Sequence, residues 1–113
     1  MKIVIVIFFV CISLEIMAKE ISLSFDDAPR LNSGYFDGVT RTNKIIENLQ
    51  KAKVKRAAFY INTIRLNSNN GLERIKKYKE AGHLIGNHTH SHIDIRSEGL
   101  ENYKADFMLA DKI

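Results

Sequence analysis

Three histidines lie within five residues of this 113-residue chain, at His88, His90 and His92. If the segment is an extended strand, alternate side chains share a face, so His88 and His90 can bind one metal ion. If the chain instead coils into a helical turn after His88, then His88 and His92 lie together at i and i+4, and His90 points elsewhere. Imidazole nitrogens suit Zn²⁺ and similar ions, so both geometries predict a metal site. An incidental histidine cluster is the alternative.

Two adjacent carboxylates, Asp26 and Asp27, form the second feature and are followed by Ala28 and Pro29. In a straight strand, neighbouring side chains point to opposite faces, whereas at a strand end that turns both carboxylates can face one site. One carboxylate can then bind a metal ion while the other acts as a general base. Because Asp and Pro are also common turn residues, the pair alone does not distinguish a site from a simple turn.

The elements that must position these side chains alternate along the chain. Apolar alternation or short apolar runs predict strands over 21–25, 56–62 and 83–87, and a helix is predicted after each strand. The order β-α-β-α-β-α predicts an α/β fold with parallel strands joined by right-handed helical crossovers. Both the carboxylate pair and the histidine cluster follow strands in this arrangement.

Local signals predict where the helices begin and end. Thr42 is expected to cap the first helix, and Asn70 with Glu73 resembles a capping box for the second. Gly82 suits the left-handed turn that ends the second helix, and Ser97 is expected to cap the last one. The side chains expected on the buried side of the last helix are Leu100, Tyr103, Phe107 and Met108.

The first 18 residues predict a secretory signal peptide. A basic start precedes an apolar run over 3–14, and Ala18 supplies the small residue before the cleavage point. The run is shorter than the roughly 20 apolar residues that span a membrane. Cleavage would leave 19–113 as one domain, exported to the periplasm or the extracellular space without stable membrane insertion; an uncleaved membrane anchor is the alternative. Cys11 would leave with the signal, so thiolate metal ligands are excluded from the mature domain.

The charge of the chain does not indicate a nucleic-acid partner. The formal net charge is +4, and much of the basic excess lies at 51–56 and 74–79, which overlap predicted helices or their ends. Solvated helix faces explain such runs, whereas a polyanion-binding surface usually shows a denser patch interleaved with aromatic residues.

Taken together, the two features resemble the first two motifs of the polysaccharide deacetylase family, carbohydrate esterase family 4, which shares the NodB homology domain. Phe25-Asp26-Asp27 resembles the family's Thr-Phe-Asp-Asp-Gly, and the segment 88–92 fits its second motif, a His, then Ser or Thr, two free positions and a second His. The segments 56–61 and 82–88 resemble the second strand and the lead into the histidine motif. The resemblance therefore covers the predicted mature chain from Ile21 onwards.

This resemblance implies a role for each matching residue. Asp26 corresponds to the catalytic base. Asp27, His88 and His92 correspond to the metal ligands, and His90 falls on a free position, which favours the helical-turn geometry. The implied reaction is metal-assisted hydrolysis of N-acetyl or O-acetyl groups on an exported polysaccharide or oligosaccharide, with Zn²⁺ as the expected ion.

The chain departs from the family pattern at three points. Ala28 replaces the glycine of the first motif, and Ile93 stands where a proline often follows the second histidine. The later motifs, which supply an arginine, an oxyanion donor and a general acid, have no counterpart. Since three strands cannot close the family's distorted (β/α) barrel, we expect the start of a NodB-type barrel, apparently truncated. The alternative to an active hydrolase is a catalytically inactive metal-binding fragment of one.

Overall fold

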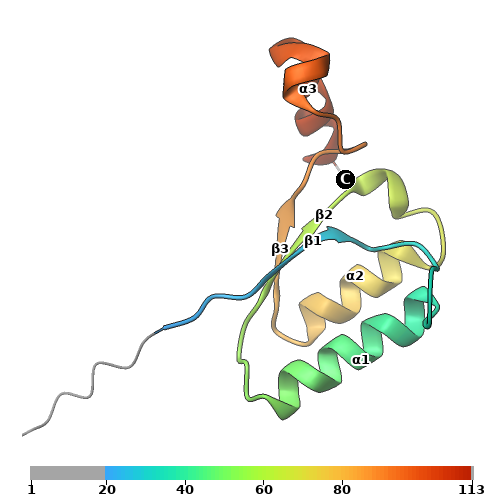
Figure 1. Cartoon of the computed structure of the whole chain (residues 1–113), viewed down its shortest axis with the longest axis vertical. Coiled ribbons are helices and arrows are strands. Elements are labelled where there is room, and N and C mark those ends of the chain that lie inside the picture. Colours follow the sequence, from blue (N-terminus) through green and yellow to red (C-terminus); the bar gives the residue numbers. More distant parts are fainter. Residues whose placement is uncertain (1–19, 113) are drawn as a thin grey trace, which may run out of the picture.

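The chain forms alternating strands and helices in a computed structural model that describes residues 20–112 (Figure 1). The elements are β1 (Ser24–Ala28), α1 (Gly38–Lys51), β2 (Ala58–Ile61), the 3₁₀ helix η1 (Thr63–Arg65), α2 (Gly71–Glu80), β3 (Leu84–Asn87) and α3 (Ile95–Ala110). The three strands form a parallel sheet in the order β1-β2-β3. The predicted α/β class and element order are confirmed. The predicted signal peptide, 1–18, lies outside the described residues.

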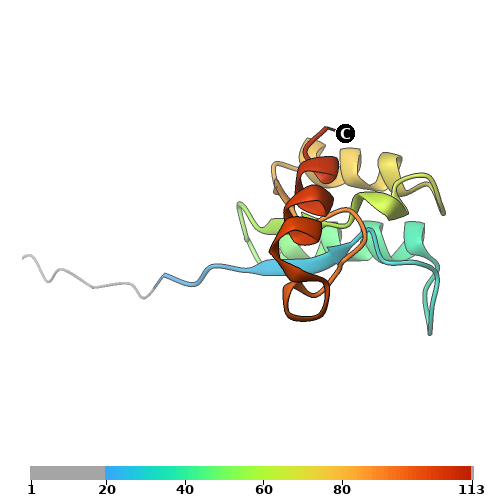
Figure 2. The same cartoon turned by 90° about the horizontal axis from the view of Figure 1, so that it is seen from above.

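One face of the sheet is covered, because α1 and α2 lie side by side against it (Figures 1 and 2). The ring of Phe59 from β2 stacks on Phe25 at a centroid distance of 4.9 Å and on Tyr78 of α2 at 3.8 Å. Neighbouring strand residues point to opposite faces, so Tyr60 and Leu84 lie on the other side. These two side chains are 39% and 52% exposed, so the described part of the chain leaves that face uncovered.

The first strand begins and ends three residues later than the sequence pattern predicts. Phe25 pairs with Phe59 and Ala28 pairs with Ile61. Between these two pairs, β1 advances by three residues while β2 advances by two. A bulge of this kind absorbs the extra residue and turns the strand locally. Asp27 lies within the bulge at a φ of 63°. The carboxylate pair therefore lies inside the last part of β1 rather than after it.

The predicted cap of the first helix is wrong. Asp37 caps α1, and its carboxylate accepts a hydrogen bond from the Thr40 backbone nitrogen at 2.8 Å. Thr42 lies inside the helix and is fully buried, where its hydroxyl donates to the Gly38 carbonyl at 3.0 Å and accepts from Arg74 Nε at 3.0 Å. Both residue types can cap a helix. The buried partner Arg74 comes from α2 and leaves no trace in the local pattern around Thr42.

Around α2 one expectation is wrong and one is confirmed. Asn70 is the residue before α2 but has a left-handed φ of 55° and makes no side-chain cap hydrogen bond, so the capping box with Glu73 does not form. Gly82 has a φ of 89°, which confirms the left-handed turn after this helix. The sequence pattern did not predict η1, because a single 3₁₀ turn is too short to show periodicity.

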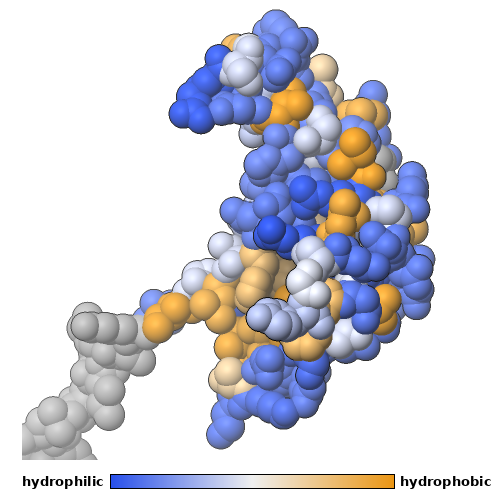
Figure 3. Space-filling view, turned by 45° about the vertical axis from the view of Figure 1, so that its right-hand side comes forward, coloured by the Kyte–Doolittle hydropathy of each residue, from blue (hydrophilic) through white to orange (hydrophobic). Residues whose placement is uncertain are grey.

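The last helix is capped by Asp94 rather than Ser97 and is kinked at Gly99, where φ is 79°. It stands beyond the carboxyl ends of the strands, away from α1 and α2 (Figure 1). Leu100 and Met108 are 54% and 56% exposed, so much of the expected buried side is uncovered within 20–112, although Tyr103 is partly buried. Figure 3 shows α3 projecting above a concave, mostly hydrophilic surface. No helix within 20–112 combines the length and apolar character needed to cross a membrane.

Candidate metal centre

Three predicted site residues converge at the carboxyl edge of the sheet. Asp27 comes from the end of β1, and His88 and His92 come from the loop that follows β3. Their ligand atoms all lie within 4.8 Å of one another. Asp27 Oδ1 is 3.4 Å from His92 Nε2 and 4.0 Å from His88 Nε2, and the two imidazole rings are 4.9 Å apart. The arrangement places one carboxylate oxygen and two imidazole nitrogens around a common point.

The position of Asp27 depends on the bulge and on an arginine from another element. Arg65 of η1 donates from Nη1 to the Asp27 carbonyl at 2.8 Å, and the same nitrogen is 3.7 Å from Asp27 Oδ1. This contact joins residues 38 positions apart and stabilises a backbone conformation that non-glycine residues rarely adopt. Arg65 was missed by sequence reasoning, because nothing in its local pattern indicates this long-range contact.

The histidine loop follows neither of the two geometries considered from sequence. Thr89 and His92 both have positive φ, at 67° and 63°, so the segment is neither a strand nor a helical turn. The Thr89 nitrogen donates to Asn87 Oδ1 at 2.7 Å, and the His92 nitrogen donates to Thr89 Oγ1 at 3.0 Å. These bonds fold the loop so that His88 and His92 meet. His90 points away and its Nδ1 is hydrogen-bonded to the Thr63 hydroxyl at 2.8 Å.

Two further residues hold this loop and were also missed. Asn62, fully buried after β2, donates to the His88 carbonyl at 2.6 Å. Asp106 of α3 accepts from the Ser91 backbone nitrogen at 2.9 Å and from the Ser91 hydroxyl at 2.7 Å. Burial by itself would raise the pKa of Asp106, but these hydrogen bonds outweigh it and lower the pKa, so the carboxylate stays charged.

Asp26 lies outside the converging group. Its side chain is exposed, and within 20–112 its carboxylate makes no hydrogen bond or ion pair. It is next to Asp27 in the chain, at the same edge of the sheet. Its role as a base stays a prediction.

The donor set fits a divalent cation. Asp27 Oδ1 is buried and has no hydrogen-bond partner among the described residues. Its nearest guanidinium nitrogen, Arg65 Nη1, lies 3.7 Å away, beyond hydrogen-bonding distance, so a closer cation would complete the environment of this oxygen. One carboxylate and two imidazoles are a common ligand set of catalytic zinc sites that keep a position open. His92 is 54% exposed, so one side of the group faces solvent.

The sequence also matches known proteins. Residues 15–113 match the polysaccharide deacetylase family. A peptidoglycan-N-acetylglucosamine deacetylase from Bacillus cereus is 29% identical over 94 residues, which is 83% of this chain and 30% of that protein. The chain thus spans about 30% of the length of this relative. The parallel sheet with alternating helices agrees with the predicted start of a NodB-type barrel. The chain belongs to the polysaccharide deacetylase family.

Proposed function

We propose that this chain carries the metal centre of an exported hydrolase that removes N-acetyl or O-acetyl groups from a polysaccharide. In this proposal Asp27, His88 and His92 hold one divalent ion, with Zn²⁺ expected from the donor set. The observation that carries it is the buried Asp27 Oδ1, which has no hydrogen-bond partner in the described chain and lies within 4.0 Å of two imidazole nitrogens. Membership of the family supports polysaccharide acetyl groups as the target.

Each residue has a distinct task in the proposed reaction. A divalent ion held by the three ligands would polarise the acetyl carbonyl and acidify water. Asp26, exposed beside Asp27, would accept the proton of the attacking water as a general base. Arg65 would keep Asp27 in place through its carbonyl. The water oxygen bonds to the acetyl carbon, and the bond from that carbon to the sugar nitrogen, or to the sugar oxygen of an O-acetyl group, breaks. The proton taken from water passes to the leaving nitrogen or oxygen, so acetate and a free amine or hydroxyl are the products.

Export is part of the same proposal. The basic and apolar start of the sequence is typical of a secretory signal peptide. The name of the Bacillus cereus relative gives peptidoglycan as its substrate, and peptidoglycan is a polymer outside the cytoplasm. Both observations support an N-acetylated glycan outside the cytoplasm as the substrate.

A second candidate is a metal-binding fragment without turnover. It is favoured by the uncovered face of the sheet and by the exposed apolar side chains of α3, because an incomplete wall around the metal centre would admit water and leave a substrate poorly oriented. This candidate keeps the same three ligands and differs only in the absence of catalysis.

Calorimetric titration with Zn²⁺ tests the metal centre shared by both candidates. We expect the chain to bind one ion and His88→Ala to weaken binding by about 100-fold or more, since loss of a ligand exceeds the 10–100-fold cost of losing a supporting residue. His90→Ala is the matched control, because His90 lies in the same loop but outside the group. Failure to bind one ion, or equal loss in both variants, refutes both candidates.

Acetate release from an N-acetylglucosamine oligomer then separates the two. The hydrolase candidate predicts release that requires Zn²⁺ or Co²⁺ and is abolished by Asp26→Asn, which leaves the ion-binding side chains in place. Binding of one ion without any release supports the fragment instead.

A further inference from the structure

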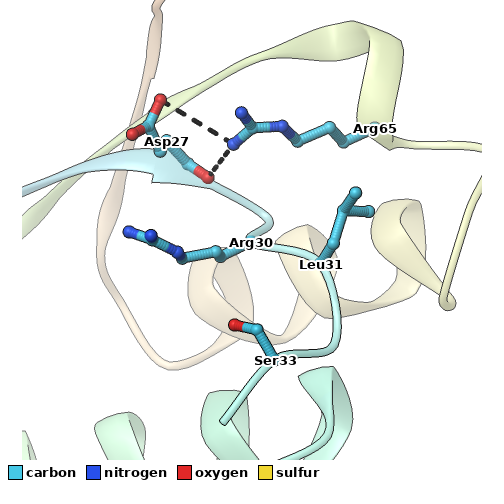
Figure 4. A pocket seen from close by; sticks show the side chains of 5 residues that line it. All are labelled: Asp27, Arg30, Leu31, Ser33 and Arg65. Atoms are coloured by element: carbon cyan, nitrogen blue, oxygen red, sulfur yellow. Dashed lines mark hydrogen bonds and ion pairs between the residues drawn. The ribbon is translucent and has the colours of Figure 1, made fainter.

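A cavity of about 260 Å³ shares one residue, Asp27, with the metal centre. It is lined by Asp27, Arg30, Leu31, Ser33 and Arg65 (Figure 4). The volume lies below the roughly 300–1,000 Å³ of pockets that hold drug-sized ligands, so it suits one sugar unit or a substituent of it. Because Asp27 belongs to both the cavity and the metal centre, a ligand here would lie next to the reacting group.

The wall of this cavity is held in place by a third arginine. Arg41 of α1 donates to the backbone carbonyls of Leu31, Ser33 and Phe36 at 2.9, 2.7 and 3.0 Å. The guanidinium of Arg41 is thereby used to fix the loop that carries Arg30, Leu31 and Ser33. The cavity is therefore formed by an ordered loop before any ligand arrives, which lowers the entropic cost of binding.

The two lining arginines differ from Arg41 in what they contact. Arg65 uses Nη1 to hold Asp27, at 2.8 Å from its carbonyl. Arg30 makes no hydrogen bond or ion pair through its side chain with any residue in 20–112, and Figure 4 draws no contact to it. An unpaired surface arginine is common, but this one lies in a cavity that shares a residue with the metal centre.

The charges in the cavity are unbalanced. Two guanidinium groups and one carboxylate line the cavity, and the proposed function assigns that carboxylate to a divalent cation. The carboxylate of Asp26 lies on the adjoining cavity, which also includes Arg30, and not on this one. A neutral sugar would leave this positive potential uncompensated, whereas an anionic group would be attracted to it. Arginine forms paired hydrogen bonds with the flat oxygen groups of carboxylates and similar anions. Leu31, 45% exposed, offers an apolar contact for the sugar ring.

We infer that this cavity binds an anionic substituent of the substrate, so that the substrate class is an acidic N-acetylated glycan, with Arg30 as the main specificity residue. The inference rests on the proposed function, since it assumes that the acetyl group reacts at Asp27, His88 and His92. The anionic group that the cavity recognises is a carboxylate or a sulfate carried by the sugar.

Binding of three matched sugars to the Zn²⁺-loaded full chain tests this, with dissociation constants measured by NMR titration. The probes are N-acetylglucosamine, N-acetylmuramic acid, which adds a carboxylate, and N-acetylglucosamine 6-sulfate. We expect at least one anionic sugar to bind about tenfold more tightly than the neutral one, the ratio expected for one charge-assisted hydrogen bond. The preferred anion distinguishes carboxylate from sulfate recognition. Raising the salt concentration from 0.05 to 0.5 M should reduce the preference, because the Arg30 guanidinium and the anionic group of the sugar are both partly exposed and salt screens their attraction.

Two variants test whether Arg30 causes the preference for anionic sugars. Arg30→Gln should abolish the preference, so that the anionic sugars bind no more tightly than N-acetylglucosamine. Arg56→Gln, an exposed arginine just before the amino end of β2, is the matched control and should retain the preference. Equal affinities for the three sugars, no measurable binding of either anionic sugar, or a preference that survives Arg30→Gln would overturn the inference. Zn²⁺ titration of the same samples keeps the two proposals apart, because normal ion binding without sugar preference refutes only this one.

Discussion

Histidines lie at both ends of the sheet. Among residues 20–112, a carboxylate lies beside the histidines at the carboxyl ends of the strands and not beside the histidine at the amino ends. His83, just before β3, is 5% exposed; its Nδ1 accepts from the Ala57 nitrogen at 3.3 Å, and burial lowers its pKa. At the carboxyl end, His88 and His92 are 29% and 54% exposed at their side chains and meet Asp27. His83 is a neutral part of the core, whereas the other two can bind a ligand. Histidine becomes a candidate ligand through the partners that the fold supplies.

The connections at each end explain this difference. At the amino end the chain returns from helix to strand in short segments, 52–57 and 81–83. At the carboxyl end the strand-to-helix segments 29–37, 62–70 and 88–94 are longer and carry Arg30, Arg65 and the histidine loop. In α/β folds, ligands bind at the carboxyl ends of parallel strands, where such loops meet.

The largest expected effect is on metal binding and acts only at the carboxyl end. Asp27→Asn should lower Zn²⁺ affinity by about 100-fold or more, because it removes the charged ligand while Asn tolerates the positive φ of this position. His83→Gln should change the affinity less than about twofold. Isothermal titration of both variants measures this, and a comparable loss in His83→Gln would remove the distinction between the two ends.

The second effect is on stability and acts mainly at the amino end. His83→Ala removes the acceptor of the Ala57 N–H and leaves a cavity beside Phe59, whose ring lies 5.5 Å away. We expect the free energy of unfolding to fall by about 2 kcal/mol in urea titrations. His92→Ala, at a half-exposed side chain, should change the metal-free stability by less than about 0.5 kcal/mol. The reverse order of the two losses would contradict the comparison.

A smaller effect should come from the contact that ties α3 to the histidine loop. Asp106→Ala leaves the Ser91 nitrogen and hydroxyl without their acceptor. We expect Zn²⁺ affinity to fall about tenfold, as for loss of a supporting residue, and stability to fall by about 1 kcal/mol. Glu101→Ala on the exposed side of the same helix is the control and should alter neither quantity. Unchanged ion affinity in Asp106→Ala would show that the loop keeps its shape without α3.

The last effect is a pH dependence of stability that comes from His83. Burial lowers its folded-state pKa below the ordinary 6.5, so the unfolded chain binds more protons in the interval between the two values. The stabilising contribution is therefore complete above pH 6.5 and is lost as the pH falls through the folded-state pKa. The slope is at most about 1.4 kcal/mol per pH unit. The free energy of unfolding, measured in urea from pH 7.5 to 5, should include this pH-dependent contribution in the unaltered chain and not in His83→Gln. Identical slopes of unfolding free energy against pH in the two proteins would refute it.

Local signals succeeded where a single residue type decides the conformation and failed where a distant partner does. Gly82 adopts the expected left-handed turn because glycine has no Cβ to oppose it. Thr42 does not cap α1, since its hydroxyl instead serves a buried hydrogen bond with Arg74 of α2. Asn70 makes no cap, and Ser97 is replaced by Asp94. Capping residues compete with one another, and packing selects among them.

The sequence by itself determined the α/β order and supplied Asp26, Asp27 and the histidines of 88–92 as candidate site residues, because both follow from residue types and short spacings. The choice of Asp27, His88 and His92 among them came from the resemblance to the family's two motifs. Only the tertiary structure decided that their ligand atoms lie within 4.8 Å and that Arg65 joins them. That convergence depends on the register of three parallel strands, on a bulge in β1 and on contacts between residues far apart in the chain. No local pattern encodes such contacts, since their free energy arises only when the strands pair.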